Sequence, residues 1–148
     1  KGDIMPRVKV ELPKKFLFST DIPIRITDIN YGAHLGNDSL LSLLHEARVR
    51  FLEHFGLQEL DIQGLGILIA DAALQYKAQA FRGDVLRVEI GLDDVGRKGC
   101  DIVYFCSNLH SGQEIARAKT GIVFFDPQKQ QVARIPDLFL QSLGLHQG

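Results

Sequence analysis

Alternation of apolar and polar residues marks the first element of the chain. Between residues 16 and 26 the even positions are Phe, Thr or Ile, whereas the odd positions include Ser, Asp, Pro and Arg. This period of two predicts a half-buried strand, and Pro23 favours an edge position for it. A helical spacing then predicts a long helix over 37–55. Its buried stripe is Leu40, Leu43, Leu44, Ala47, Phe51 and Phe55. Asn37 or Asp38 is the expected N-cap, and Gly56 the C-terminal stop.

Four more strands are expected, over 66–78, 85–95, 100–109 and 114–125. They are separated by short turns with the sequences FRGD, GRKG and HSGQ, which predict an antiparallel meander. In the first of these strands the even positions predict one continuous apolar face: Leu68, Ala70, Ala72, Leu74 and Tyr76. The strand 100–109 is apolar on both sides, which favours a central place in the sheet. A short helix is expected over 136–143, starting at Pro136.

The order of these elements predicts an α+β protein with a single domain, residues 1–148. An antiparallel sheet of about five strands would wrap around one long central helix. Residues 1–14 are expected to form an N-terminal arm, and residues 1–4, before the only methionine, are interpreted as an expression remnant. One helix covers only part of such a sheet. The remaining edge and apolar face favour a homodimer formed by sheet pairing, or a dimer of dimers.

Composition and charge exclude several classes of protein. The formal net charge is -1 and no block of Lys and Arg occurs, so we expect no nucleic-acid partner. No apolar run approaches the ~20 residues of a membrane span, and no signal peptide is recognisable. Cys100 and Cys106 lie too far apart in one strand to bridge, and free thiols fit a cytoplasmic protein. The histidines show no metal-ligand spacing, so we expect no metal.

The richest chemistry lies in TDINYGAHLGNDSLLSLLHEAR, residues 27–48. A polar loop leads directly into the long helix, whose free N–H groups and partial positive charge could bind an oxyanion. Leu35, Gly36 and Asn37 would lie at this end. Glu46 falls on the helix flank outside the apolar stripe. It is either a partly desolvated general base or merely the i,i+4 partner of Arg50.

This stretch resembles the hotdog-fold thioesterases, in the branch of 4-hydroxybenzoyl-CoA thioesterase and the small acyl-CoA thioesterases. The resemblance rests on D-I-N-Y-G-A-H-L-G-N from Asp28, on E-A-R-V-R-F-L from Glu46, and on the Gly-Asp turn that ends at Asp84. The chain departs from the pattern at Asn30, where many relatives have a catalytic Asp, and at Gly36, where they have Asn. The resemblance implies a hotdog fold and hydrolysis of a thioester.

The resemblance also implies roles for individual residues. Glu46 would be the general base or nucleophile, Asn30 would hold water or substrate, and His34 would assist proton transfer. Asp28 is the rival catalytic carboxylate, although it could instead shape the loop by Asx-type hydrogen bonds. Because coenzyme A carries phosphates, four basic residues at strand ends are tentative ligands for it. They are Lys77, Arg82, Arg97 and Lys98.

The expected function is therefore hydrolysis of an acyl- or aryl-CoA to the free acid and CoA, with no cofactor beyond the CoA of the substrate. One alternative is a hydratase or dehydratase, although the motifs of those relatives are not found. A second alternative is a non-catalytic acyl-CoA binder or ligand sensor, which Asn30 in the Asp position favours. The sequence does not define the acyl group.

Overall fold

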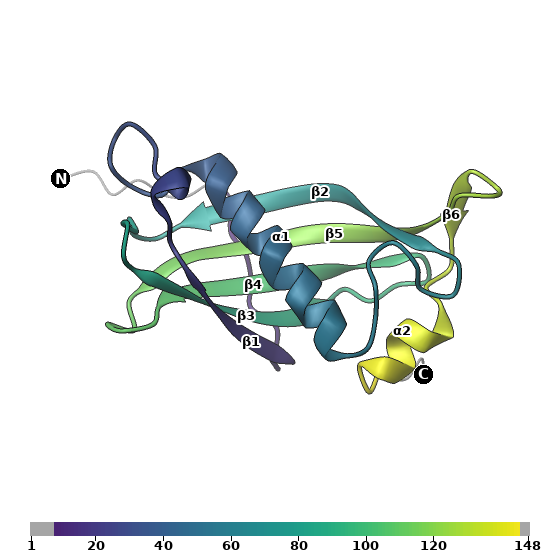
Figure 1. The fold of residues 1–148 in the computed structure, drawn as a ribbon. Coiled ribbons are helices and arrows are strands. Elements are labelled where there is room, and N and C mark those ends of the chain that lie inside the picture. The colour runs from purple at the N-terminus through teal and green to yellow at the C-terminus, as the bar shows by residue number, and fades with distance from the viewer. Residues whose placement is uncertain (1–7, 146–148) are drawn as a thin grey trace.

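One antiparallel sheet and one long helix dominate the computed structural model, which describes residues 8–145 (Figure 1). Residues 1–4, interpreted above as an expression remnant, lie outside the described range. The elements are β1 (Phe18–Pro23), a 3-10 turn η1 (Ile26–Asp28), α1 (Asn37–His54), β2 (Gly66–Tyr76), β3 (Val85–Asp93), β4 (Gly99–Asn108), β5 (Glu114–Asp126), β6 (Gln131–Ala133) and α2 (Asp137–Ser142). The strand order is β1-β3-β4-β5-β2, and β6 pairs with β5. The α+β prediction, the edge place of the first strand and the central place of β4 are thus confirmed.

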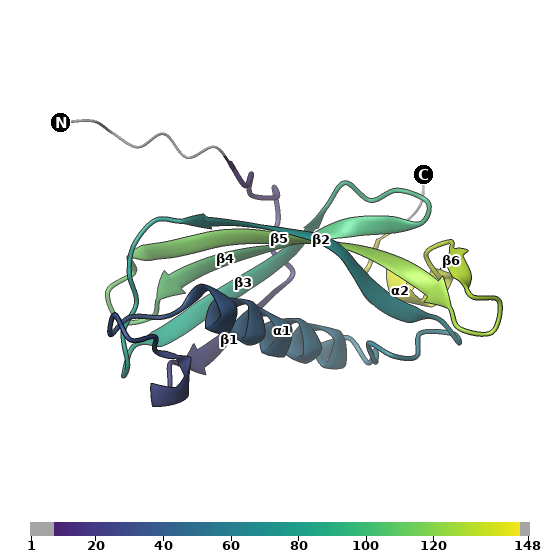
Figure 2. The same ribbon diagram turned by 90° about the horizontal axis from the view of Figure 1, so that it is seen from above.

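The helix α1 lies against one face of the curved sheet, nearest to β1 and β3 (Figure 2). The predicted apolar stripe is buried except for the partly exposed Phe55, because it faces the sheet. Across the other face run residues 8–17, where the Val10 amide donates to Gln75 Oε1 over 3.0 Å and Phe16 packs on Phe105. The sheet is therefore covered on both sides, but only in part.

The predicted meander is correct for β3, β4 and β5 and wrong for β2. β2 pairs with β5 at the far edge, so residues 77–84 cross the end of the sheet instead of forming a hairpin. The crossing is held by Lys77 N–H to Ile115 O, 2.9 Å, and by Leu35 N–H to Ala80 O, 2.8 Å. This second bond ties the crossing to the loop that precedes α1, which brings two distant segments together.

The continuous apolar face predicted for β2 is also wrong, because the strand contains a bulge between Ile69 and Asp71. Ile69 lies opposite Ile122 and Ala72 opposite Thr120, so the inward face changes from odd to even positions within the strand. Leu68 points outward and is 47% exposed. Of the inward-facing side chains of β2, Ile67 is buried, but Ile69 and Tyr76 are 42% and 41% exposed, since α1 sits over the opposite edge of the sheet.

Both ends of α1 are set by glycines. The N-cap is Gly36, with φ -80° and ψ 159°, and no side chain within residues 8–145 caps the helix, so the predicted cap at Asn37 or Asp38 is wrong. At the other end Gly56 has φ +75°, and the Leu57 amide donates to Leu52 O over 2.8 Å. This is the αL termination that glycine allows, and it confirms Gly56 as the stop. The sequence did not predict η1 or β6.

The two cysteines are free and buried in β4, as small hydrophobic side chains. Burial raises the pKa of both thiols to about 12. Across residues 8–145, none of the helices combines the length and apolar character needed to cross a membrane. The same residues contain no group of three His, Cys, Asp or Glu side chains that could hold a metal ion.

Candidate active site

The loop before α1 is shaped by the side chain of Asn30. Its Oδ1 accepts hydrogen bonds from the Gly32 amide at 2.9 Å and the His34 amide at 3.4 Å, which is an Asx-type turn. Ala33 takes the left-handed conformation, φ +67°. Asn30, predicted to hold water or substrate, therefore has its carbonyl oxygen committed to the loop.

Asp28 is only 4% exposed, and its carboxylate serves η1. Oδ2 accepts from the Arg25 amide at 2.8 Å, and Oδ1 lies 3.4 Å from the Arg25 guanidinium. The backbone oxygen of Asp28 accepts from the Gly36 amide at 3.2 Å. These contacts match the structural alternative for Asp28, since they place the residue in the support of the loop.

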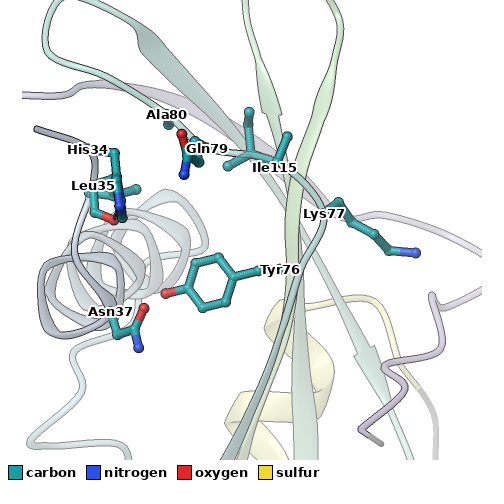
Figure 3. A pocket seen from close by; sticks show the side chains of 9 residues that line it. His34, Leu35, Asn37, Tyr76, Lys77, Gln79, Ala80 and Ile115 are labelled. Atoms are coloured by element: carbon teal, nitrogen blue, oxygen red, sulfur yellow. Dashed lines mark hydrogen bonds between the residues drawn. The ribbon is translucent and has the colours of Figure 1, made fainter. Parts of the chain in front are cut away.

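A cavity of about 350 Å³ opens where the loop, the start of α1 and the crossing segment meet (Figure 3). Its walls come from three segments: His34, Leu35 and Asn37; Tyr76, Lys77, Ala78, Gln79 and Ala80; and Ile115. We call this space the loop cavity. The wrong meander prediction explains why sequence reasoning missed its second wall, since residues 77–80 were placed in a strand and a hairpin instead of beside the loop.

His34 is the one imidazole in the walls of the loop cavity among the described residues. Its Nδ1 lies 3.3 Å from Leu35 O, and a carbonyl oxygen can only accept, so Nδ1 carries the proton in the neutral ring. Nε2 is then the nitrogen with the free lone pair. A Cβ on Gly32 would come within 3.3 Å of Nε2, so the glycine leaves this nitrogen room.

Tyr76 reaches across the loop cavity from the end of β2, with its hydroxyl directed toward Asn37 at the start of α1 (Figure 3). Burial raises the pKa of this phenol to about 12, with smaller contributions from Cys106 and Asp38. The group is therefore a neutral O–H donor at physiological pH. Sequence reasoning assigned Tyr76 to an apolar face. Only its position at the end of a strand could have indicated a role.

The segment predicted to bind an oxyanion, Leu35, Gly36 and Asn37, lies at the N-terminus of α1. Leu35 N–H already donates to Ala80 O and Gly36 N–H to Asp28 O, so neither amide is free. Among the described residues no side chain accepts from the first turn of α1, whose amides begin at Asn37. An anion at this end would therefore meet the amides of the first helical turn and the positive end of the helix dipole.

Glu46 lies away from the loop cavity. Its Oε2 is 2.8 Å from Arg50 Nε, and Arg50 also donates to Thr20 Oγ1 on β1 over 3.0 Å. Glu46 is nine residues from Asn37, or about 14 Å along the helix axis, and its side chain is 52% exposed. Within one chain the structure does not bring Glu46 together with His34 and Asn37.

The four basic residues tentatively assigned to coenzyme A lie at two ends of the sheet. Lys77 lines the loop cavity, with its ammonium group directed away from Tyr76, and Arg82 lies in the same crossing segment (Figure 3). Arg97 and Lys98 precede Gly99, which pairs with Val123 at the other end of β5. Ile115, which pairs with Lys77, and Val123 are eight residues apart along β5, or roughly 26 Å, so one chain does not gather these four charges.

Comparisons with known proteins agree with this architecture. The family model described as "Thioesterase-like superfamily" matches residues 24–143. A 1,4-dihydroxy-2-naphthoyl-CoA thioesterase from Synechocystis superimposes with a TM-score of 0.79 at 21% identity, over 86% of this chain and 95% of that one. A DHNA-CoA thioesterase from Staphylococcus aureus gives 0.76 at 17% identity, over 85% and 87%. The search of curated proteins returned no match. These likenesses confirm the predicted hotdog fold.

Proposed function

Because the chain belongs to the thioesterase-like superfamily, we propose that it hydrolyses an acyl- or aryl-CoA thioester in the loop cavity. The observation that carries the proposal is the convergence of three groups on one space: the imidazole of His34, the first turn of α1, and the phenol of Tyr76. Thioester hydrolysis requires a base for water and donors for the carbonyl oxygen, and these groups supply both.

In the proposed reaction, His34 Nε2 accepts a proton from a water molecule as the water oxygen attacks the carbonyl carbon. The amides of the first helical turn and the Tyr76 hydroxyl donate hydrogen bonds to the oxygen that becomes negative. Collapse of the tetrahedral intermediate breaks the C–S bond, and the departing sulfur takes the proton from His34. The products are the carboxylic acid and coenzyme A.

This assignment gives the base role to His34 instead of Glu46. Within residues 8–145 no carboxylate lines the loop cavity, and the carboxylate of Glu46 pairs with Arg50 on the β1 side of α1. Asn30 and Asp28 become positioning residues, since their side chains hold the loop and η1. Of the four basic residues considered for coenzyme A, Lys77 lines the loop cavity, and its ammonium group, directed away from Tyr76, would meet a phosphate outside the cavity.

We also propose that the protein works as a homodimer, joined along the free edge of β2. This edge strand carries three partly exposed large apolar side chains, Leu68, Ile69 and Tyr76. An unpaired edge with exposed apolar side chains is a template for pairing with a second copy. Such pairing would cover the seam between α1 and β2 and exclude water from the loop cavity.

The proposal is tested by following thiol release from a panel of acyl- and aryl-CoA esters, with His34→Gln and Tyr76→Phe beside the wild type. Thiol release that depends on both side chains supports it. A non-catalytic acyl-CoA binder is the second candidate, favoured by the absence of a carboxylate in the described cavity walls. Tight binding of a CoA ester that stays intact would select that candidate.

A further inference from the structure

A second cavity, of about 320 Å³, lies further along the seam between α1 and β2. Leu41, His45 and Arg48 line it from the helix, Ala72 from β2, and Thr120 from β5. We call it the seam cavity. Both cavities lie between α1 and β2. In the loop cavity these two elements contribute Asn37 and Tyr76. A group bound at the helix N-terminus could therefore extend along the seam into this second space.

A buried polar network borders the seam cavity. The side chain of Arg48 is only 7% exposed. It donates from Nη1 to Tyr104 Oη at 3.2 Å and from Nη2 to Glu59 Oε1 at 3.3 Å. His45 Nε2 lies 3.4 Å from Glu59 Oε2, and the Tyr104 and Thr120 hydroxyls are 2.8 Å apart. Five side chains from four segments thus meet beside a space whose remaining lining residues are Leu41, Ser42, Leu44, Ile69 and Ala72.

This network is incomplete. Among the described residues Arg48 Nε makes no hydrogen bond, and Glu59 Oε2 has only the long approach of His45 Nε2 at 3.4 Å. The Tyr104 oxygen already accepts from Arg48, so its proton is best donated to Thr120. The proton of Thr120 is then free to serve the cavity it lines. Arg48 and Thr120 are the members of the network that line the cavity beside His45. A ligand group that pairs with them gains affinity relative to an alkyl end that leaves them unpaired.

The charges decide which polar group fits. Arg48 is already neutralised by Glu59, so a ligand carboxylate would face the negative charge of Glu59 at close range. A hydroxyl is uncharged and can pair with Arg48 or Thr120, which both line the cavity. An alkyl end offers neither bond. Asn37 and His45 are eight residues apart, or about 12 Å along the axis, which an extended chain of roughly ten carbons covers with bonds of about 1.5 Å.

From these observations we propose that the seam cavity holds the far end of the acyl group and favours acyl chains that carry a hydroxyl there. The inference rests on the proposed function for the position of the thioester. It adds a substrate class, medium-chain hydroxyacyl-CoA, and assigns Thr120 and Arg48 to its recognition.

The test uses two hydrolysis-resistant thioethers, decyl-CoA and 10-hydroxydecyl-CoA, titrated calorimetrically into the full-length protein. We expect the hydroxylated ligand to bind at least about tenfold more tightly, the discrimination typical of one satisfied hydrogen bond. In Thr120→Val this ratio should fall toward one with little change for decyl-CoA. Thr20→Val is the matched control, because Thr20 lies on β1 beside Arg50, and it should keep the wild-type ratio.

Equal binding of the two thioethers by the wild-type protein would overturn the inference, and so would failure of both to bind. An unchanged ratio in a folded Thr120→Val variant would also overturn it. Because thioethers are not hydrolysed, these outcomes are independent of turnover. A protein that prefers the hydroxylated thioether but releases no thiol from CoA esters would keep the seam cavity assignment and lose the proposed function.

Discussion

At the residue scale, the chemistry depends on which side chains reach the loop cavity and which are held elsewhere. The motif predicted the loop and the start of the helix correctly, although not its cap, because a polar cluster before a helix is a local property of the sequence. It could not show that Asn30 is engaged with the Gly32 amide or that Glu46 turns toward Arg50. Those outcomes depend on loop closure and on contacts with β1, which no local pattern encodes.

His34→Gln should lower kcat by about 10²–10³, because the variant keeps a polar side chain but loses the base for water. KM should change little. Steady-state kinetics on the best CoA ester gives the answer, with a thermal melt to confirm folding. A kcat within twofold of the wild type would remove His34 from the mechanism.

Glu46→Gln should leave kcat within about twofold, since the carboxylate is a half-exposed partner of Arg50 and such helix pairs contribute only ~0.3–0.5 kcal/mol. The same assay checks it. A loss of kcat comparable to that of His34→Gln would restore Glu46 as the catalytic carboxylate, acting on a site that one chain alone does not assemble.

Tyr76→Phe should lower kcat by about 10² through loss of one oxyanion donor. The pKa of the Tyr76 phenol, about 12, also predicts how the kcat of the wild type depends on pH. The phenol stays protonated across the neutral and moderately alkaline range, so wild-type kcat should show no loss from its ionisation below pH 10. Unchanged kcat in Tyr76→Phe would reduce Tyr76 to a wall of the cavity.

At the element scale, α1 was predicted almost to the residue, whereas β2 was misplaced. The helix has a strong apolar stripe and a glycine stop, and both signals are local. The bulge of β2 exchanges its faces within one strand, and its pairing with β5 joins residues far apart in the sequence. Alternation cannot reveal a bulge, and short turns suggested a hairpin where the chain in fact crosses the sheet end. The predicted hairpin is the reason why the sequence did not place residues 77–80 in the wall of the loop cavity.

Gly56→Ala should lower the free energy of unfolding by about 1–2 kcal/mol, because φ +75° is unfavourable for an L side chain. The added Cβ would meet nothing within 4 Å, so the cost is conformational and not steric. Chemical denaturation measures it. We expect kcat to stay near wild type, since this helix end is remote from the loop cavity. A stability equal to the wild type would contradict the assigned αL stop.

At the scale of the whole molecule, burial of the two thiols links stability to pH. Folding raises the pKa of Cys100 and Cys106 from 9.0 to about 12. Their contribution is present below pH 9 and is lost as the pH rises toward 12, because the unfolded chain ionises first. The slope is about 1.4 kcal/mol per pH unit per thiol. The Cys100→Ala/Cys106→Ala variant should show a flatter alkaline decline in denaturation experiments. An equally steep decline would contradict this cause.

The oligomeric state is also a property of the whole molecule. The sequence predicted a dimer because one helix leaves part of the sheet uncovered. Sedimentation velocity at micromolar concentration should give a dimer, and Leu68→Glu on the β2 edge should weaken it. Leu138→Glu is the matched control, because Leu138 is similarly exposed but lies on α2. A monomeric wild-type protein, or equal weakening by both variants, would contradict pairing through β2.

The proposed hydrolysis is tested most directly by measuring the release of free thiol from a panel of acyl- and aryl-CoA esters. The wild-type protein and His34→Gln are compared. We expect catalytic release with at least one ester and a loss of about 10²–10³ in kcat for the variant, with folding retained. No release above buffer with any ester, or equal release by both proteins, would contradict hydrolysis at the helix N-terminus with His34 as its base.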